Sequence, residues 1–201
     1  MENIKVWDWP VRIGHWLLVG SFIVAWLSGE SESFRLVHVL AGGCVVGVAS
    51  FRLVWGVIGT RYARFGDFVH GPKAVLNYLY NLLRLRPQHH VGHNPAGGWA
   101  ILLLLGLGIT TGLVGWLIYN DIGSDWLDGL HEGLASLMLG VVLVHIAGVL
   151  SGSLLHGENL VRAMWTGNKQ GEQAQAIPST WPLAGAVLLI WVVGTAWWLA
   201  R

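Results

Sequence analysis

Five apolar stretches, each close to or above the length that crosses a lipid bilayer, constrain this chain more than any other feature. They cover about residues 11–29, 34–59, 96–119, 126–155 and 181–200. A bilayer core is spanned by about 20 apolar residues in an α-helix. Only 11% of the 201 residues are charged, which is far below the usual level in soluble domains. The sequence therefore predicts an all-α integral membrane bundle of five spans, with no room for a separate soluble domain.

Lysine and arginine are distributed unevenly between the two sides of this bundle. With the N-terminus placed in the cytoplasm, the cytoplasmic segments hold Lys5, Arg12, Arg52, Arg61, Arg64, Lys73, Arg84, Arg86, Arg162 and Lys169, and the other side holds Arg35 and Arg201. Basic residues accumulate on the cytoplasmic side of membrane proteins, so we expect the N-terminus inside and the C-terminus outside. The outer loops are acidic and contain Glu30, Glu32, Asp121, Asp125, Asp128 and Glu132.

Capping residues predict where three of the spans begin. Pro10 suits the first turn of a helix, where its missing N–H costs nothing. The candidate caps are Asp8 or Trp9 for the first span, Ser33 for the second, and Ser124 or Asp125 for the fourth. These starts place His15, His38 and His131 each about one turn and a half inside a span, just below a membrane surface.

Two histidines lie fourteen residues apart in the fourth span, namely His131 and His145. Fourteen residues are close to four helical turns, so both imidazoles leave the same helix face, about 21 Å apart along the axis. His131 is then level with His38 near the outer surface, and His145 with His15 in the inner half. Depth alone predicts the pairs His38 with His131 and His15 with His145.

Imidazole is a good ligand for haem iron, and a haem held by two histidines has no open position for a substrate. We therefore interpret the four histidines as the axial ligands of two b-type haems. The alternative is that each is a packed polar residue bonded across helices. Ionisable side chains inside a membrane are costly and usually functional, which favours the haem interpretation for four residues at matched depths.

Three arginines are candidates to bind haem propionates. Arg52 follows His38 by fourteen residues and therefore shares its helix face, beside the inner site. Arg12 and Arg35 lie near the ligands of the inner and outer sites. The alternative for each is an interaction with lipid phosphates. Trp16, next to His15, is a candidate to pack on a haem.

The remaining histidines lie in predicted cytoplasmic segments, where a histidine is usually solvated. They are His70, His89, His90, His93 and His156. Three of these, at 89, 90 and 93, could bind a metal adventitiously, although nothing else supports a site. His70 and His156 each precede a glycine near the inner surface, and they could line a quinone pocket and relay protons.

Other segments carry weaker signals. Residues 72–86 have helical apolar spacing and basic ends, which predicts an amphipathic helix at the membrane interface. Residues 168–180 form a polar linker before the last span. Glycines four apart, at 43/47, 108/112 and 148/152, suit close helix packing or the approach of a flat macrocycle. Cys44 is the single cysteine, and the absence of a C-x-x-C-H motif excludes a covalently attached c-type haem.

Several motifs resemble those of the bacterial cytochrome b561 family, and in particular the b-type cytochrome subunits of nickel–iron hydrogenases and their relatives. The similar segments are WDWPVRIGHW, LVHVLAGGCVVGVASFRLVWG, RYARFGDFVHGPKAVLNYL, LHEGLASLMLGVVLVH and HGENLVRAMWTGNK, within about residues 5–170. The resemblance implies a helical bundle in the bacterial inner membrane with two non-covalent b haems, held by the same histidine pairs. The chain departs from the four-helix core of that family by its fifth span. We accordingly divide it into a dihaem domain, residues 1–170, and a linker with an extra helix, residues 171–201.

The main functional hypothesis is transmembrane electron transfer between a periplasmic redox partner and the quinone pool or a second partner. The acidic outer loops would attract a basic partner such as a c-type cytochrome. The resemblance implies a hydrogenase subunit as the other candidate. A rival hypothesis is a stand-alone quinone-linked oxidoreductase that acts on a small molecule such as superoxide or ferric iron. A third is a non-redox protein whose histidines carry protons or metals. Membrane lipids are expected around the chain, and nucleic acid is not expected as a partner.

Overall fold

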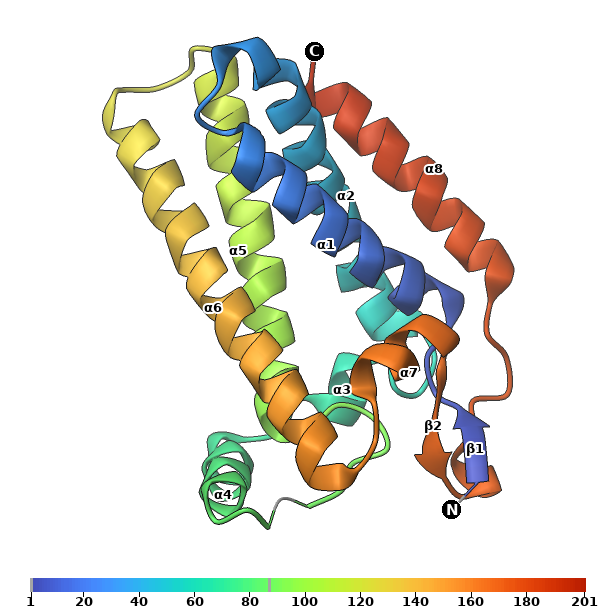
Figure 1. The fold of residues 1–201 in the computed structure, drawn as a ribbon. Coiled ribbons are helices and arrows are strands. Elements are labelled where there is room, and N and C mark those ends of the chain that lie inside the picture. Colours follow the sequence, from blue (N-terminus) through green and yellow to red (C-terminus); the bar gives the residue numbers. More distant parts are fainter. Residues whose placement is uncertain (1, 87) are drawn as a thin grey trace.

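Five long helices dominate the structure, a computed structural model that describes residues 2–86 and 88–201. They are α1 (Trp9–Ser28), α2 (Arg35–Ile58), α5 (Pro95–Tyr119), α6 (Trp126–His156) and α8 (Pro182–Leu199). Each is long and apolar enough to cross a membrane. They form one bundle with the N- and C-termini at opposite ends (Figure 1), as an odd number of crossings requires. The prediction of an all-α bundle with five long apolar helices is confirmed.

The helix starts follow the predicted caps only in part. Asp8 caps α1, and its carboxylate accepts a hydrogen bond of 2.9 Å from the backbone N–H of Val11. Ser33 was the wrong choice for the second span, because a 3₁₀ turn (Glu32–Phe34) places it before α2, which follows Phe34 directly. Asp125 precedes α6, but its side chain makes no capping bond. The α6 start therefore depends on packing more than on a cap.

Helix α2 lies at the centre of the bundle and packs against α1, α5 and α8. Glycine allows two of these close approaches. A β-carbon added at Gly43 would lie 2.7 Å from the Ala196 Cα of α8, and one at Gly108 of α5 would lie 3.0 Å from the Val45 side chain of α2. The packing role predicted for these two glycine pairs is confirmed. Gly148, in the third pair, has no atom within 4 Å of an added β-carbon.

Helix α6 packs along α5 but has few close backbone approaches to α1 or α2 among the described residues. Its side chains therefore project both outward and toward the rest of the bundle. The outward residues are apolar and exposed, for example Leu137, Val144 and Leu154. Exposed apolar side chains on a helix whose backbone bonds are satisfied internally are compatible with surrounding lipid.

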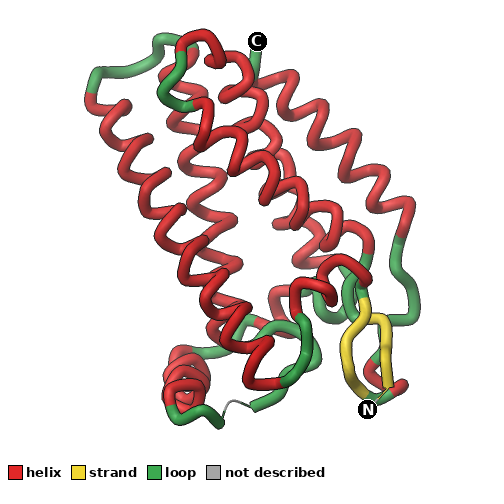
Figure 2. Tube along the Cα trace, in the orientation of Figure 1, coloured by secondary structure: helices red, strands yellow, loops and turns green. Residues whose placement is uncertain are grey.

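Shorter elements gather at the end of the bundle that carries the N-terminus. They are β1 (Glu2–Lys5), α3 (Phe65–Phe68), α4 (Pro72–Leu83), α7 (Leu160–Thr166), β2 (Asn168–Gly171) and a 3₁₀ turn (Gln173–Gln175). Figure 2 shows the two strands confined to this end. Helix α4 coincides with the predicted amphipathic helix and lies outside the bundle (Figure 1). The helix is confirmed, whereas its place at a membrane interface stays a prediction.

The two strands correct the prediction that residues 168–180 are only a polar linker. Strand β1 pairs antiparallel with β2, with Glu2 opposite Gly171 and Lys5 opposite Asn168. Ile4 within β1 and Val6 just after it are almost completely buried in a cluster with Trp55 of α2. The pairing was missed because strands of four residues carry no detectable alternation. It ties the start of the chain to the segment that precedes α8.

Candidate functional site

His38 of α2 and His131 of α6 face each other at the end of the bundle opposite the N-terminus. The centres of the two rings are 5.9 Å apart, and their planes are inclined by 65°. A metal–imidazole nitrogen bond is about 2 Å long, as it is for zinc, so two rings that bind one ion from opposite sides have centres about 6 Å apart. The structure therefore brings this predicted pair together at a separation that suits a shared metal ion.

Both imidazoles are oriented by backbone carbonyls of neighbouring helices. The Nδ1 atom of His38 lies 2.9 Å from the carbonyl oxygen of Ala25, and the Nδ1 atom of His131 lies 3.0 Å from that of Thr111. A carbonyl oxygen only accepts, so each Nδ1 is the donor and carries the proton. Each Nε2 then has a free lone pair. A hydrogen bond of this kind, made by the ring nitrogen that does not bind the metal, fixes the tautomer of metal-binding histidines.

Small residues make room for His131 on α5. A β-carbon at Gly115 would lie 2.8 Å from the Cε1 atom of the His131 ring. The Thr111 hydroxyl, one turn away, is shielded from solvent and has no hydrogen-bond partner among the described residues. At this end, Arg35 places its guanidinium 5.3 Å from the centre of the Tyr119 ring. Its predicted contact with a propionate stays a prediction.

His15 of α1 and His145 of α6 form the second predicted pair, toward the end of the bundle that carries the N-terminus. They lie close enough for the charge of one imidazole to act on the other. The His15 ring packs edge-on against Trp16, with ring centres 5.2 Å apart. Trp16 packs in turn against Trp165 of α7 at 5.6 Å. A direct contact is thus shown for His38 and His131, whereas the pairing of His15 with His145 stays a prediction.

Several hydrogen-bond donors beside the second pair are shielded from solvent and lack partners among the described residues. These donors are Trp16 Nε1, Arg12 Nε and Arg52 Nη1. Arg52 is buried, and its guanidinium lies 5.3 Å from the centre of the Phe65 ring. Arg12 also donates to the carbonyl of Trp165 and stacks 4.4 Å from the centre of the Trp9 ring. Buried donors without partners are costly, so an anionic group such as a propionate fits here.

Four of the remaining histidines, at residues 70, 89, 90 and 93, line one cavity. His89 packs against His156, with ring centres 5.5 Å apart, and His90 packs against Tyr78 at 5.8 Å. His70 lines two cavities of about 250 and 260 Å³, whereas His156 lines neither. Among the described residues, no group of three or more His, Cys, Asp and Glu side chains is placed to hold a metal ion.

Two residues of this region are more deeply embedded than the sequence indicated, where Asp8 was a candidate cap and His93 a loop histidine that could bind a metal adventitiously. His93 lies between Trp7 and Phe68, with its ring centre 4.6 Å from each of theirs. Asp8 is completely buried and bonds to α2 as well as capping α1. The only sequence signal for Asp8 was its place between two tryptophans before a proline, and His93 gave none beyond the Gly-His-Asn-Pro turn.

A bundle of five membrane-length helices, with histidines that face each other inside it, defines a multi-span membrane protein. The chain belongs to the prokaryotic cytochrome b561 family, whose model matches residues 6–167. The family binds haem b, and electron transport follows from membership. The match ends before α8. No solved structure matches the chain.

Three relatives carry names that refer to hydrogenases. The chain is 25% identical to a probable Ni/Fe-hydrogenase B-type cytochrome subunit of Bradyrhizobium diazoefficiens, over 84% of this chain and 86% of the relative. It is 23% identical to a probable subunit of the same name in Rhizobium leguminosarum, over 84% and 89%. It is 28% identical to a probable Ni/Fe-hydrogenase 1 B-type cytochrome subunit of Escherichia coli K12, over 58% and 60%.

Proposed function

We propose that this cytochrome carries electrons across the membrane through two b haems, each held by two histidines. His38 and His131 would hold the outer haem, and His15 and His145 the inner one. The observation that carries the proposal is the facing pair of His38 and His131, each with Nδ1 bonded to a carbonyl so that Nε2 is free. A haem with two histidine ligands supplies reversible one-electron transfer without an open coordination position.

The residues around the outer pair would orient the ligand rings, and those around the inner pair would bind haem propionates. At the outer site, Gly115 leaves space beside the His131 ring, and the Ala25 and Thr111 carbonyls hold the two rings in place. At the inner site, Arg52 and Trp16 offer donors that have no protein partner among the described residues. These donors would bind and orient propionates, and the buried guanidinium would offset their negative charge.

Absorption and electron paramagnetic resonance spectra of the purified chain test this proposal. We expect two low-spin, six-coordinate haems per chain. His38→Ala and His131→Ala should each remove the same haem, and His15→Ala and His145→Ala the other. A colourless but folded chain would contradict the proposal, and loss of haem in crossed combinations would contradict the pairing.

The partners are inferred from charge and from the names of the relatives. We propose that the N-terminus is cytoplasmic, that the outer haem exchanges electrons with a hydrogenase subunit or a c-type cytochrome, and that the inner haem exchanges them with quinone. Asp121, Asp125 and Asp128 are exposed beside the outer site. Reversing these three charges should slow reduction by a basic partner at low ionic strength, with little effect at high salt. An unchanged rate at low salt would argue against docking on this face.

A further inference from the structure

A cavity of about 260 Å³ opens at the end of the bundle that carries the N-terminus. Its walls include His70, His89, His90 and His93, together with Asp67. A water molecule takes about 30 Å³ in the liquid, so the cavity holds several waters next to polar partners. It therefore offers a wet route from the surface to His93.

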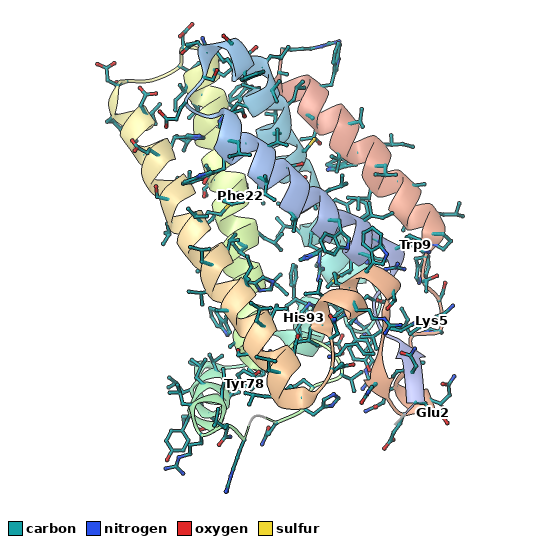
Figure 3. All side chains as sticks on the ribbon, viewed as in Figure 1. Glu2, Lys5, Trp9, Phe22, Tyr78 and His93 are labelled. Carbon is teal, nitrogen blue, oxygen red and sulfur yellow. The ribbon has the colours of Figure 1, made fainter. Side chains whose placement is uncertain are left out.

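His93 closes the inner end of this route. Figure 3 shows His93 at the end of the bundle that carries the N-terminus. Its ring centre lies 4.6 Å from that of Trp7 and 4.6 Å from that of Phe68. Its Nδ1 atom is shielded from solvent and has no hydrogen-bond partner among the described residues. The His93 imidazole is thus a polar ring that packs between two aromatic side chains.

The positive charges that act on His93 come from four different elements of the structure. The groups that carry them are Arg52 of α2, Lys169 of β2, His145 of α6 and His15 of α1. Burial, with the positive charge of Arg52 as the next cause, holds the pKa of His93 well below its ordinary value. The imidazole therefore stays neutral near pH 7, with one nitrogen as donor and the other as acceptor.

A buried ion pair fixes the loop that carries these histidines. The Lys169 ammonium donates to the carbonyl of His90 at 3.0 Å and lies 3.4 Å from the Glu158 carboxylate. Both charged side chains are buried. Glu158 also accepts from the backbone N–H of Gln170 at 2.7 Å. The loop that lines the cavity is thereby tied at His90 to β2 and to the segment between α6 and α7.

We propose that His93 and this cavity form the proton path between the cytoplasmic surface and the quinone that exchanges electrons with the inner haem. This inference rests on the function proposed above. Quinone takes up two electrons and two protons, and each carbonyl oxygen becomes a hydroxyl. For each proton, neutral His93 gives the one on one ring nitrogen toward the quinone and receives another from cavity water at the second nitrogen. After the transfer the ring is uncharged and is the other tautomer. A rotation of the ring by half a turn between Trp7 and Phe68 then restores the starting arrangement.

The haem-loaded chain allows electron and proton steps to be separated. Chemically reduced chain is mixed either with duroquinone, whose reduction needs protons, or with ferricyanide, whose reduction needs none, and haem oxidation is followed by absorbance. We expect His93→Phe, which refills the aromatic slot, to slow the duroquinone reaction by about tenfold or more and to leave the ferricyanide reaction unchanged. His93→Ala should behave alike and recover with added imidazole, whereas His93→Phe should not recover. Haem content is measured first, and His93→Gln is a second packing-conservative variant.

Deuterium exchange gives a readout that needs no quinone. Because the Cε1 hydrogen of a histidine exchanges through the protonated ring, His93 is followed by mass spectrometry in D₂O at mildly acidic pH, where it should exchange because the cavity brings water to the ring. Complete protection would overturn the cavity as a water path, and a normal duroquinone rate in His93→Phe would overturn the relay while leaving the proposed function intact. If the unaltered chain reacts with ferricyanide but not with duroquinone, the quinone part of the proposed function fails and this path fails with it.

Discussion

Asp8 and Trp55 lie 47 residues apart in the sequence and are joined by a hydrogen bond of 2.9 Å from the indole N–H to the carboxylate. The same carboxylate oxygen accepts a second bond of 2.7 Å from the Thr60 hydroxyl, and the other oxygen caps α1. One fully buried side chain thus joins the start of α1 to the end of α2. It fixes the helix that presents His15 against the helix that presents Arg52.

Replacement of Asp8 by alanine should destabilise the chain by about 3 kcal/mol or more. The change removes a helix cap, worth about 1 kcal/mol, and leaves two buried donors unpaired at about 1–3 kcal/mol each. Thermal unfolding in detergent, followed by circular dichroism, measures the effect. Asp67→Ala is the matched control, since the Asp67–Arg64 pair is exposed and should contribute less than about 1 kcal/mol. Equal shifts for the two variants would contradict the role of Asp8.

The bundle was predictable because its signal is repeated along each span, whereas the strand pairing at the end that carries the N-terminus was not. Every residue of a span contributes to a long apolar stretch, and each helix satisfies its own backbone. Strand β1 pairs with a segment more than 160 residues away, and its four residues carry no periodic pattern. Such pairing is decided by tertiary packing of Ile4 and Val6, which no local pattern encodes.

In the candidate site too, the part that lies on long helices was predictable and the part that lies in a loop was not. Span direction and helical spacing were enough to pair His38 with His131. Two histidines on different helices that face the bundle interior at the same depth have few other possible neighbours. His93 looked like a solvated loop residue. Its slot is built by Trp7, Phe68 and the loop itself, three segments whose meeting depends on the folding of the short elements. The burial of a loop histidine such as His93 can be recognised only once the positions of those short elements in the fold are known.

Gly115→Ala should weaken binding of the outer haem while leaving the inner one in place. The new β-carbon would lie 2.8 Å from His131 Cε1 and 3.1 Å from its Nδ1, so the ring must shift away from the Thr111 carbonyl. Loss of such an orienting bond typically costs about 10–100-fold in metal affinity. Haem content and redox titration of the purified chain measure this. Gly106→Ala, where an added β-carbon meets nothing within 4 Å, should bind both haems normally.

Gly43→Val should loosen the contact between α2 and α8. An added β-carbon at this position lies 2.7 Å from the Ala196 Cα, and backbone cannot rotate away as a side chain can. Overpacking of this kind costs about 1–3 kcal/mol, which thermal unfolding in detergent would detect. Gly194→Val on α8, where an added β-carbon meets nothing within 4 Å, should leave the midpoint nearly unchanged. A shared shift would mean that valine itself, and not the contact, is responsible.

Acid should destabilise the end of the bundle around His93. Burial holds the pKa of His93 well below the ordinary value of 6.5 in the folded chain, while in the unfolded chain it returns to about 6.5. The unfolded state therefore binds a proton that the folded state refuses once the pH falls below about 6.5. Stability is retained above that pH and declines below it, by up to about 1.4 kcal/mol per pH unit until the folded chain also protonates. Melting curves at several pH values should show this slope in the unaltered chain and a smaller one in His93→Phe, because phenylalanine keeps the packing and does not titrate. Equal slopes in the two proteins would assign the acid sensitivity to another group, such as His90, whose pKa is also lowered by burial.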